Sequence, residues 1–288
     1  VGIGPGDEVI VTDYTMVATP NSVVLAGATP AFHDIDKYNL CLDIDTLVIT
    51  PKTKAIIYVS MNGRSHSMKK ISGFAKQHNL HLIEDSSQSL GSRVDGEHLG
   101  TFGDLGVFSF SAPKVISCGA GGAVVTNCNE LAQHVRMMKD FGRAKNGQDE
   151  YLTMGWNFKF TDLQAVVGIE QMKKLEWRVQ RKKEMFDLYK SLLDCYVEFI
   201  PTNIANTSPF FIDILVDKRD ELKQHLEDHG VGSRKFYPAL HSQPVYKLPG
   251  SYPVSEDVAK RGLWLPSSSF LSDNQIADVS HIIRNFSA

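Results

Sequence analysis

The stretch that decides the fold runs from residue 55 to residue 88 and reads AIIYVSMNGRSHSMKKISGFAKQHNLHLIEDSSQ. Its first six residues form a short apolar run typical of a buried strand. Residues 68–79 then place Ile71, Phe74 and Ala75 on one face at helical spacing, and residues 81–85 form a second strand. A strand, a helix and a strand within about thirty residues predict a βαβ unit and therefore a parallel sheet.

The same alternation continues on both sides of this unit. In chain order we expect a strand at 8–12, a helix at 21–26, a strand at 29–34, strands at 103–110 and 122–126, a helix at 130–141 and a long helical pattern at 162–193. Asp162 is the predicted N-cap of the last pattern, whose apolar stripe begins at Leu163. These elements predict an α/β protein with a mixed, mostly parallel central sheet flanked by helices.

The composition changes near Ile200-Pro201, which suggests a second unit. Beyond this point the pattern predicts a strand at 210–216, a helix at 219–229 and a final helix with Ser272 as its N-cap. We therefore expect a large domain at residues 1–195 and a smaller C-terminal α/β domain at 196–288.

Composition narrows the function. The net charge of −3 gives no basic surface for a polyanion, so we expect no nucleic-acid partner. The four cysteines (Cys41, Cys118, Cys128 and Cys195) form no CxxC pair and have no His cluster at zinc spacing. We read them as reduced thiols of a cytoplasmic protein without a metal site. No apolar run is long enough to span a bilayer, so we expect no membrane association.

Polar residues follow two of the predicted strands. Asp85 ends one strand of the opening stretch, and Gln88 follows three residues later. Lys114 lies in a glycine-flanked loop after another strand, five residues beyond Ser109. A cofactor that drains carbanion charge into a pyridine ring needs a lysine to form an imine and a carboxylate for the ring nitrogen. It also needs hydroxyl or backbone N–H groups for its phosphate, and a polar side chain at the ring oxygen.

Each of these residues alone has a simpler interpretation. An aspartate after a strand is most often a helix N-cap, and a loop lysine is most often a surface charge. Ser109 in an apolar run would be a satisfied buried hydroxyl, and Gln88 a solvated side chain. The order and spacing of the four residues favour the cofactor site over these separate readings.

The strings EDSSQSLGS and LGTFGDLGVFSFSAPKVISCGAGGAVVTN resemble the core of the DegT/DnrJ/EryC1/StrS family. Further similarity lies in GIGPGDEVIV, in YTMVATPNSVVLAGATPAFHDID, in MGWNFKFTDLQAVVGIEQMKKLE and in YPALHSQPVY, and so covers nearly the whole chain. The family consists of fold-type-I, pyridoxal 5′-phosphate (PLP)-dependent aminotransferases that act on nucleotide-linked keto-sugars. The chain is slightly more similar to its perosamine-synthase-like branch.

The resemblance implies a role for each of the four residues. Lys114 would hold PLP as a Schiff base and later move protons as the catalytic residue. Asp85 would pair with the pyridinium nitrogen, Gln88 would bond the ring hydroxyl, and Ser109 would contact the phosphate. Residues 1–195 would then be the PLP-binding domain.

Two further residues follow from the resemblance. Asn157 would reach the phosphate held by a neighbouring subunit, which implies a homodimer with a shared active site. Met16 stands where an aromatic residue often stacks on the PLP ring, a position that a thioether can fill. The expected partners are an amino-acid donor, glutamate or glutamine, and a nucleotide-linked keto-deoxysugar. A non-catalytic PLP-fold protein with a regulatory or structural role is the alternative.

The chain departs from the family pattern in two places. The family has a small-residue, Thr-containing loop before the GxGPGDEV strand, so we expect residues upstream of Val1. The segment 60–66 replaces a Leu-Tyr-Gly-like turn, and we read it as a solvated loop whose Arg64 or His66 could reach substrate. Candidates for the nucleotide diphosphate, each with a surface or structural role as the simpler reading, are Lys159, Arg234, Tyr237 and His241.

Overall fold

The computed structural model describes residues 1–145, 147–246 and 248–287, and its larger sheet has six strands in the order β2-β1-β3-β4-β7-β8. These strands are β1 (Glu8–Thr12), β2 (Thr29–His33), β3 (Thr53–Val59), β4 (His81–Asp85), β7 (Leu105–Ser109) and β8 (Gly122–Val125). All neighbours are parallel except β7 and β8. The predicted mixed, mostly parallel sheet is confirmed.

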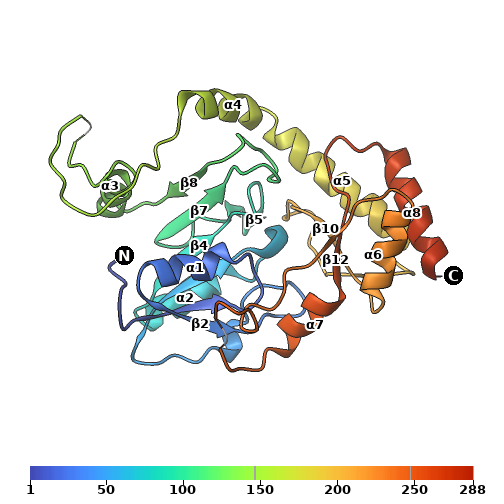
Figure 1. Cartoon of the computed structure of the whole chain (residues 1–288), viewed down its shortest axis with the longest axis horizontal. Coiled ribbons are helices and arrows are strands. Elements are labelled where there is room, and N and C mark those ends of the chain that lie inside the picture. The colour runs from blue at the N-terminus through green and yellow to red at the C-terminus, as the bar shows by residue number, and fades with distance from the viewer. Residues whose placement is uncertain (146, 247, 288) are drawn as a thin grey trace.

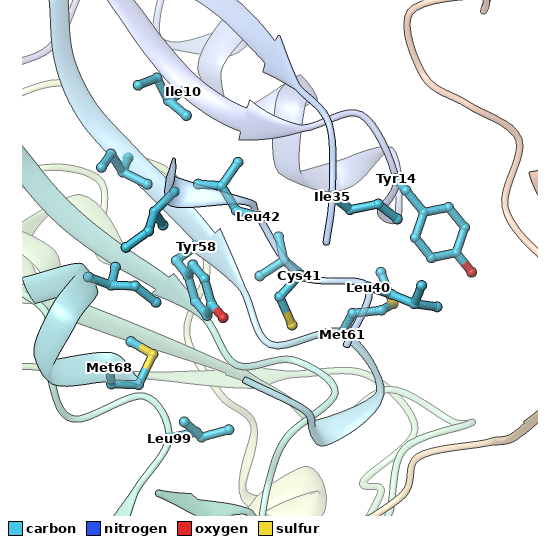
Figure 2. Close-up of a cluster of buried hydrophobic side chains, with 14 of the residues drawn as sticks. Ile10, Tyr14, Ile35, Leu40, Cys41, Leu42, Tyr58, Met61, Met68 and Leu99 are labelled. Carbon is cyan, nitrogen blue, oxygen red and sulfur yellow. The ribbon is translucent and has the colours of Figure 1, made fainter. Parts of the chain in front are cut away.

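The helices α1 (Ala18–Leu25) and α2 (Met68–Gln77) connect successive parallel strands (Figure 1). The strand β3 is buried at every position except Lys54, as expected for a strand covered on both faces. Figure 2 shows side chains of β1, β3, α2 and the segment 35–42 meeting in one apolar cluster, which includes Tyr14, Tyr58 and Met61. This cluster includes Leu82 of β4, the strand whose carboxyl end carries Asp85.

The smaller sheet is antiparallel, in the order β11-β12-β10-β9. Its strands and helices are β9 (Glu198–Phe199), β10 (Ile212–Leu215), α6 (Arg219–Asp228), β11 (Arg234–Lys235), α7 (Pro253–Arg261), β12 (Gly262–Leu265) and α8 (Asp273–Ser287). The expected N-cap Ser272 is present, because its Oγ accepts the N–H of Gln275 at 3.3 Å. A second apolar cluster joins this sheet to the end of α5 (Leu175–Leu193) through Phe186 and Tyr189.

The pattern expected to run continuously over 162–193 is two helices, α4 (Asp162–Met172) and α5. The N-cap of α4 is Thr161, so the expectation for Asp162 was wrong by one residue. The Thr161 hydroxyl accepts the N–H of Gln164 at 3.3 Å, and the Gln164 side chain accepts the N–H of Thr161 at 3.0 Å. This reciprocal pair satisfies two N-terminal donors that Asp162 would leave open.

We define the arm as α3 (Asn129–Met138), the described residues up to 161, and α4. Figure 1 shows it extending from the edge of the larger sheet beyond β8. No described residue of α3 or α4 is buried, although both helices carry apolar side chains. The stripe that begins at Leu163 therefore does not pack into the core of its own chain.

The remaining short elements are a hairpin of β5 (Arg93–Val94) with β6 (Glu97–His98) and single turns at Ile44–Thr46 and Met61–Gly63. No helix in the described ranges is long and apolar enough to cross a membrane. Among the same residues, no group of three or more His, Cys, Asp or Glu side chains is placed to hold a metal ion.

Candidate active site

The sheet brings the polar residues of two neighbouring strands to one edge. Asp85 is the last residue of β4 and is in register with Val107 of the parallel strand β7. Ser109 is the last residue of β7, and the turn that carries Lys114 follows it. Gln88 lies in the turn after β4. Ligands bind at the carboxyl ends of such strands, so the order in the sequence corresponds to one place in the fold.

The carboxylate of Asp85 is held from two sides. Thr19 Oγ1 donates to Asp85 Oδ2 at 2.7 Å, and the Ser87 N–H donates to Asp85 Oδ1 at 3.1 Å. Thr19 is buried at the start of α1. No sequence pattern selects Thr19, because a threonine before a proline is typical of an ordinary helix start. In the structure Thr19 fixes the orientation of the Asp85 carboxylate.

Gln88 and Ser109 also have defined partners. Gln88 is buried, and its Oε1 accepts the backbone N–H of Asn62 at 3.1 Å. The solvated side chain considered for Gln88 is therefore excluded. Ser109 Oγ donates to Ser111 Oγ at 3.1 Å and accepts the Ser111 N–H at 3.4 Å. The end of β7 thus presents two hydroxyls and a backbone N–H within one turn, the kind of donors that a phosphate uses.

Lys114 is partly buried, and it is not the surface charge that a loop lysine usually is. Burial lowers the pKa of its amine to about 8, and the negative charge of Asp85 opposes this shift. The Lys114 Nζ lies 4.4 Å from the centre of the Phe210 ring. A lysine in this state supplies a neutral amine near neutral pH, which imine formation requires. Phe210 had no signal in the sequence.

The pKa of Lys114 leads to a testable pH dependence. Protein freed of cofactor should capture PLP at a rate that rises about tenfold per pH unit below pH 8 and levels off above it, because only the neutral amine attacks. An ordinary lysine, with a pKa of about 10.4, would give a rate that still rises at pH 9. Stopped-flow absorbance at a series of pH values measures the midpoint. A midpoint above pH 10 would contradict the burial of this amine.

A cavity of about 610 Å³ opens beside Lys114, between its loop and the smaller sheet. Arg178, Lys182 and Arg234 line it together with Lys114, and none of the described lining residues is acidic. Arg178 Nε and Ser233 Oγ are buried and have no hydrogen-bond partner among the described residues. The cavity therefore combines two guanidinium groups and two lysine amines with two unused donors, which suits an anionic ligand.

Helix α5 fixes the wall of this cavity. Arg178 Nη1 donates to the carbonyl of Val115, the residue after Lys114, at 3.0 Å. One turn later, Lys182 Nζ donates to the carbonyl of Phe210 at 3.0 Å and to that of Ser267. Burial, with a smaller effect of Arg178, lowers the pKa of Lys182 to about 8. These contacts tie the Lys114 loop and the Phe210 ring to one helix.

Met16 and Asn157, the other two residues expected in the cofactor site, have different surroundings from Lys114 and Asp85. Met16 lies before α1, is 45% exposed, and its sulfur accepts the Ala18 N–H at 3.1 Å. Beside it, Thr15 Oγ1 is buried without a partner among the described residues. Asn157 is exposed on the arm and forms an isolated antiparallel β-bridge with Asp140. No hydrogen bond within the described ranges joins Asn157 to Lys114.

Most of the residues considered as ligands of the nucleotide diphosphate already contact other residues of the chain. Lys159 pairs with Asp140 at 2.6 Å. His241 Nδ1 contacts the buried carboxylate of Asp13 at 2.8 Å, which gives this side chain a structural role. Tyr237 packs edge-on against Trp264. Arg234 lies over the Tyr237 and Trp264 rings and lines the cavity, so among the four it is the one that a ligand there would meet.

The interpretation of segment 60–66 as a solvated loop was wrong. The Arg64 side chain is 3% exposed, and its Nη2 lies 2.6 Å from Asp213 Oδ2, which is equally buried. His66 contacts Asn39 instead of the cavity. The sequence could not show this, because the partner of Arg64 lies 149 residues away.

The set of donors at this edge fits PLP. The cofactor needs an amine, a carboxylate, an amide and hydroxyls, and Lys114, Asp85, Gln88 and Ser109 supply them from adjacent strand ends. The buried Thr15 Oγ1, which has no hydrogen-bond partner among the described residues, is a further donor three residues beyond the carboxyl end of β1 in the same sheet. Within the part of the chain that the structure describes, none of these side chains forms an ion pair that would have to break.

The family model of the DegT/DnrJ/EryC1/StrS aminotransferase family matches residues 1–284. GDP-perosamine synthase of Escherichia coli O157:H7 is 34% identical over 294 residues, with 99% of this chain and 80% of that protein covered. The UDP-N-acetyl-3-dehydro-alpha-D-glucosamine 3-aminotransferase of Acidithiobacillus ferrooxidans is 34% identical over 291 residues, with coverage of 98% and 78%.

A protein named as a pleiotropic regulatory protein, from Geobacillus stearothermophilus, is 33% identical over 298 residues and has coverage of 99% and 80%. Among solved structures, a DegT DnrJ EryC1 StrS aminotransferase from Brucella abortus matches with a TM-score of 0.94 at 32% identity. That match covers 100% of this chain and 81% of the other.

Proposed function

The chain belongs to the DegT/DnrJ/EryC1/StrS aminotransferase family and is a PLP-dependent aminotransferase, and from this premise we propose that it aminates a nucleotide-linked keto-deoxysugar with glutamate or glutamine as donor. The observation that carries the proposal is the convergence of Lys114, Asp85, Gln88 and Ser109 at the carboxyl ends of β4 and β7. The names of the two aminating relatives, which refer to GDP- and UDP-linked sugars, support the acceptor class.

PLP supplies a pyridine ring that accepts the electron pair released when a bond at the amino-acid α-carbon breaks. Around that ring, Lys114 Nζ takes the proton from the α-carbon as a general base and returns a proton as a general acid. The Asp85 carboxylate would keep the ring nitrogen protonated. Gln88 would donate to the ring oxygen, and the Ser109 hydroxyl would hold the phosphate. The Phe210 ring covers Lys114 Nζ and keeps water from that side.

The cavity beside Lys114 supports anionic substrates for both half-reactions. A donor amino acid brings carboxylates and a nucleotide sugar brings a diphosphate, and both match a lining with Arg178, Lys182 and Arg234 and no acid among its described residues. An enzyme that uses two such substrates in turn can hold them in one site, because the first product leaves before the second substrate enters.

The alternative is a PLP-fold protein with a regulatory role, which the name of the Geobacillus stearothermophilus relative keeps in view. Addition of glutamate distinguishes an aminotransferase from a regulatory protein that only binds PLP. A catalyst loaded with PLP should lose its visible absorption band on addition of glutamate as the cofactor takes up the amino group, and release a keto acid. A protein that binds PLP but shows no spectral change with glutamate or glutamine would favour the regulatory role.

We also propose that residues 1–195 form the PLP-binding domain and 196–288 a small domain, in a cytoplasmic protein. The apolar cluster between α5 and the smaller sheet supports this division, and the cluster under the larger sheet joins the two parts, because it also contains Ile200, Leu215, Phe236, Val258 and Trp264. The last two turns of α5 pack with the smaller sheet, so the helix links the two. The four free cysteines are consistent with a reducing compartment.

A homodimer is the second part of the proposal, and the arm supports it. The side chains of Leu163, Val166 and Ile169 on α4 are 83%, 62% and 59% exposed, and Met154 and Phe158 before it are 77% and 71% exposed. Exposed apolar surface of this extent marks an interaction site. A second copy is the occupant we propose, because Asn157 lies on the same arm and would then reach a partner's cofactor site.

A charge on the arm should dissociate this dimer. Leu163→Asp is expected to shift the protein to monomer at micromolar concentration and to weaken PLP binding, because a buried unpaired carboxylate costs several kcal/mol at an interface. Sedimentation at a series of concentrations measures the change. Leu25→Asp, at an 88% exposed leucine of α1, is the matched control. Equal dimer content in both variants would exclude the arm as the interface.

A further inference from the structure

The turn Met61–Gly63 is the part of the departing segment 60–66 that connects the two sheets. Met61 belongs to the core cluster under the larger sheet (Figure 2). Asn62 is buried and has a left-handed backbone with φ of 53°. Its side chain reaches Phe211, directly before β10, and Asp213 within that strand, although these lie about 150 positions away in the chain.

The amide of Asn62 is fully used in this contact. Its Nδ2 donates to the carbonyl of Phe211 at 2.9 Å and to Asp213 Oδ2 at 2.8 Å, and its Oδ1 accepts the Phe211 N–H at 2.7 Å. Asp213 is held from the other side by Arg64, whose Nη1 and Nη2 donate at 3.1 Å and 2.6 Å. The side chains of the pair are 3% and 2% exposed. Groups this deeply buried and this fully bonded have one arrangement.

The same residue also orients Gln88. The backbone N–H of Asn62 can only meet an acceptor, so the contact of 3.1 Å assigns Oε1 to that side of the Gln88 amide. The Nε2 group is therefore left as a donor for another partner. Gln88 is 5% exposed, which leaves it little freedom to turn over. The turn thus decides which end of the amide is available to a cofactor.

Phe211 connects the turn to the other face of the site. Its neighbour Phe210 places a ring 4.4 Å from Lys114 Nζ, and the two phenylalanine rings lie 4.0 Å apart. A change in the position of Phe211 would move the ring that covers Lys114. Asn62 therefore contacts, directly or through one residue, both Gln88 and the cover of Lys114.

We propose that Asn62, held by the Arg64–Asp213 pair, is a positioning residue that couples the docking of the smaller sheet to the orientation of the Gln88 amide and of the Phe210 ring. The inference rests on the proposed function, because Gln88 and Lys114 are its PLP ligands. Movement of β10 away from the larger sheet would release the Gln88 amide and the Phe210 ring at once. Cofactor affinity and the protonation of the bound cofactor would then depend on the seating of the smaller sheet.

The test is a spectroscopic pH titration of PLP-loaded Asn62→Gly. Glycine keeps the left-handed backbone without strain, so only the amide contacts are lost. The turn that presents its backbone N–H to Gln88 is then no longer held against Phe211 and Asp213. We expect the pH midpoint of the visible band to rise by about one unit, because Gln88 on a looser turn stabilises the anionic ring oxygen less. We also expect PLP to bind about tenfold more weakly. The unfolding temperature of the cofactor-free protein measures stability separately.

Ser255→Ala is the matched control. Ser255 is fully buried and its Oγ donates to Asp34 Oδ1 at 2.7 Å, so it also joins the C-terminal part to the larger sheet, but it does not contact Gln88. It should lower the unfolding temperature and leave the midpoint and the PLP affinity unchanged. A wild-type midpoint and affinity in Asn62→Gly would overturn the inference alone. A wild-type protein without any PLP band would overturn the proposed function as well.

A second variant covers the case in which Asn62→Gly does not fold. The double substitution Arg64→Met with Asp213→Leu replaces the buried ion pair by apolar side chains, a change that is often neutral for stability. It removes one partner of the Asn62 amide and leaves the two contacts with Phe211. We expect the same direction of shift with a smaller size. An unchanged midpoint in this folded variant would equally overturn the inference.

Discussion

Lys114→Ala is expected to lose the visible absorption band of lysine-bound PLP and to slow transamination by at least about 10⁴-fold. Two functions are removed together. The amine that anchors the cofactor is lost, and so is the base that moves the proton at the α-carbon. The low pKa of Lys114, about 8 because of burial, makes this amine available for both at neutral pH. Absorbance spectra and keto-acid release measure the two losses separately.

The Lys114→Ala experiment must distinguish Lys114 from Lys182, because Lys182 is a second buried amine with a pKa of about 8 that lines the same cavity. Its Nζ donates to two backbone carbonyls, which stabilise the charged form and hold it in place. Borohydride reduction of the loaded protein followed by peptide mapping should therefore label Lys114. Lys76→Ala, at an exposed lysine of α2, serves as the control for loss of a surface charge. A reducible band that persists in Lys114→Ala would assign the anchor to another lysine.

The sequence predicted the larger sheet and the strand-end positions of Asp85 and Ser109 because both depend on local patterns. The run 55–60 and the spacing of Ile71 and Ala75 identify a βαβ unit without reference to the rest of the chain. Once the strands are parallel, a polar residue at the end of each strand must lie at the same edge. The sequence alone therefore predicts that Asp85 and Lys114 lie at the same edge of the sheet.

The residues that the sequence missed depend on contacts between distant parts of the chain. Thr19 meets Asp85 across 66 positions, and Asn62 meets Asp213 across 151. Neither has a local pattern, and Asn62 resembles an ordinary loop residue. The apolar stripe of α4 is the opposite case, because it has a clear local pattern but the prediction drawn from it was wrong. Its period predicts a buried face, but Leu163 is 83% exposed among the residues that the structure describes. Helical periodicity indicates that a face will be covered, but it does not indicate whether the same chain or another molecule covers it.

Asp85→Asn should lower the turnover number by about 10²–10³-fold, the range found when one preorganised electrostatic contact is removed. The neutral amide cannot keep the ring nitrogen protonated, so the charge released at the α-carbon has no stabilised place to go. The same substitution has a second expected effect, of known sign. Asp85 raises the pKa of Lys114 against the lowering by burial, so its loss should move the pH midpoint of PLP capture below 8.

Thr19→Val separates the charge of Asp85 from its orientation. Valine removes the 2.7 Å hydrogen bond to Asp85 Oδ2 and keeps the carboxylate charged. We expect a loss in turnover of about tenfold, the size of one hydrogen bond to a charged group, with the capture midpoint near pH 8 retained. If Asp85→Asn and Thr19→Val gave equal losses and equal midpoints, Asp85 would act only through its place in the hydrogen-bond network. A larger loss in Asp85→Asn, together with its lower midpoint, would show that the negative charge itself is required, because the two variants share the altered contact and differ in that charge.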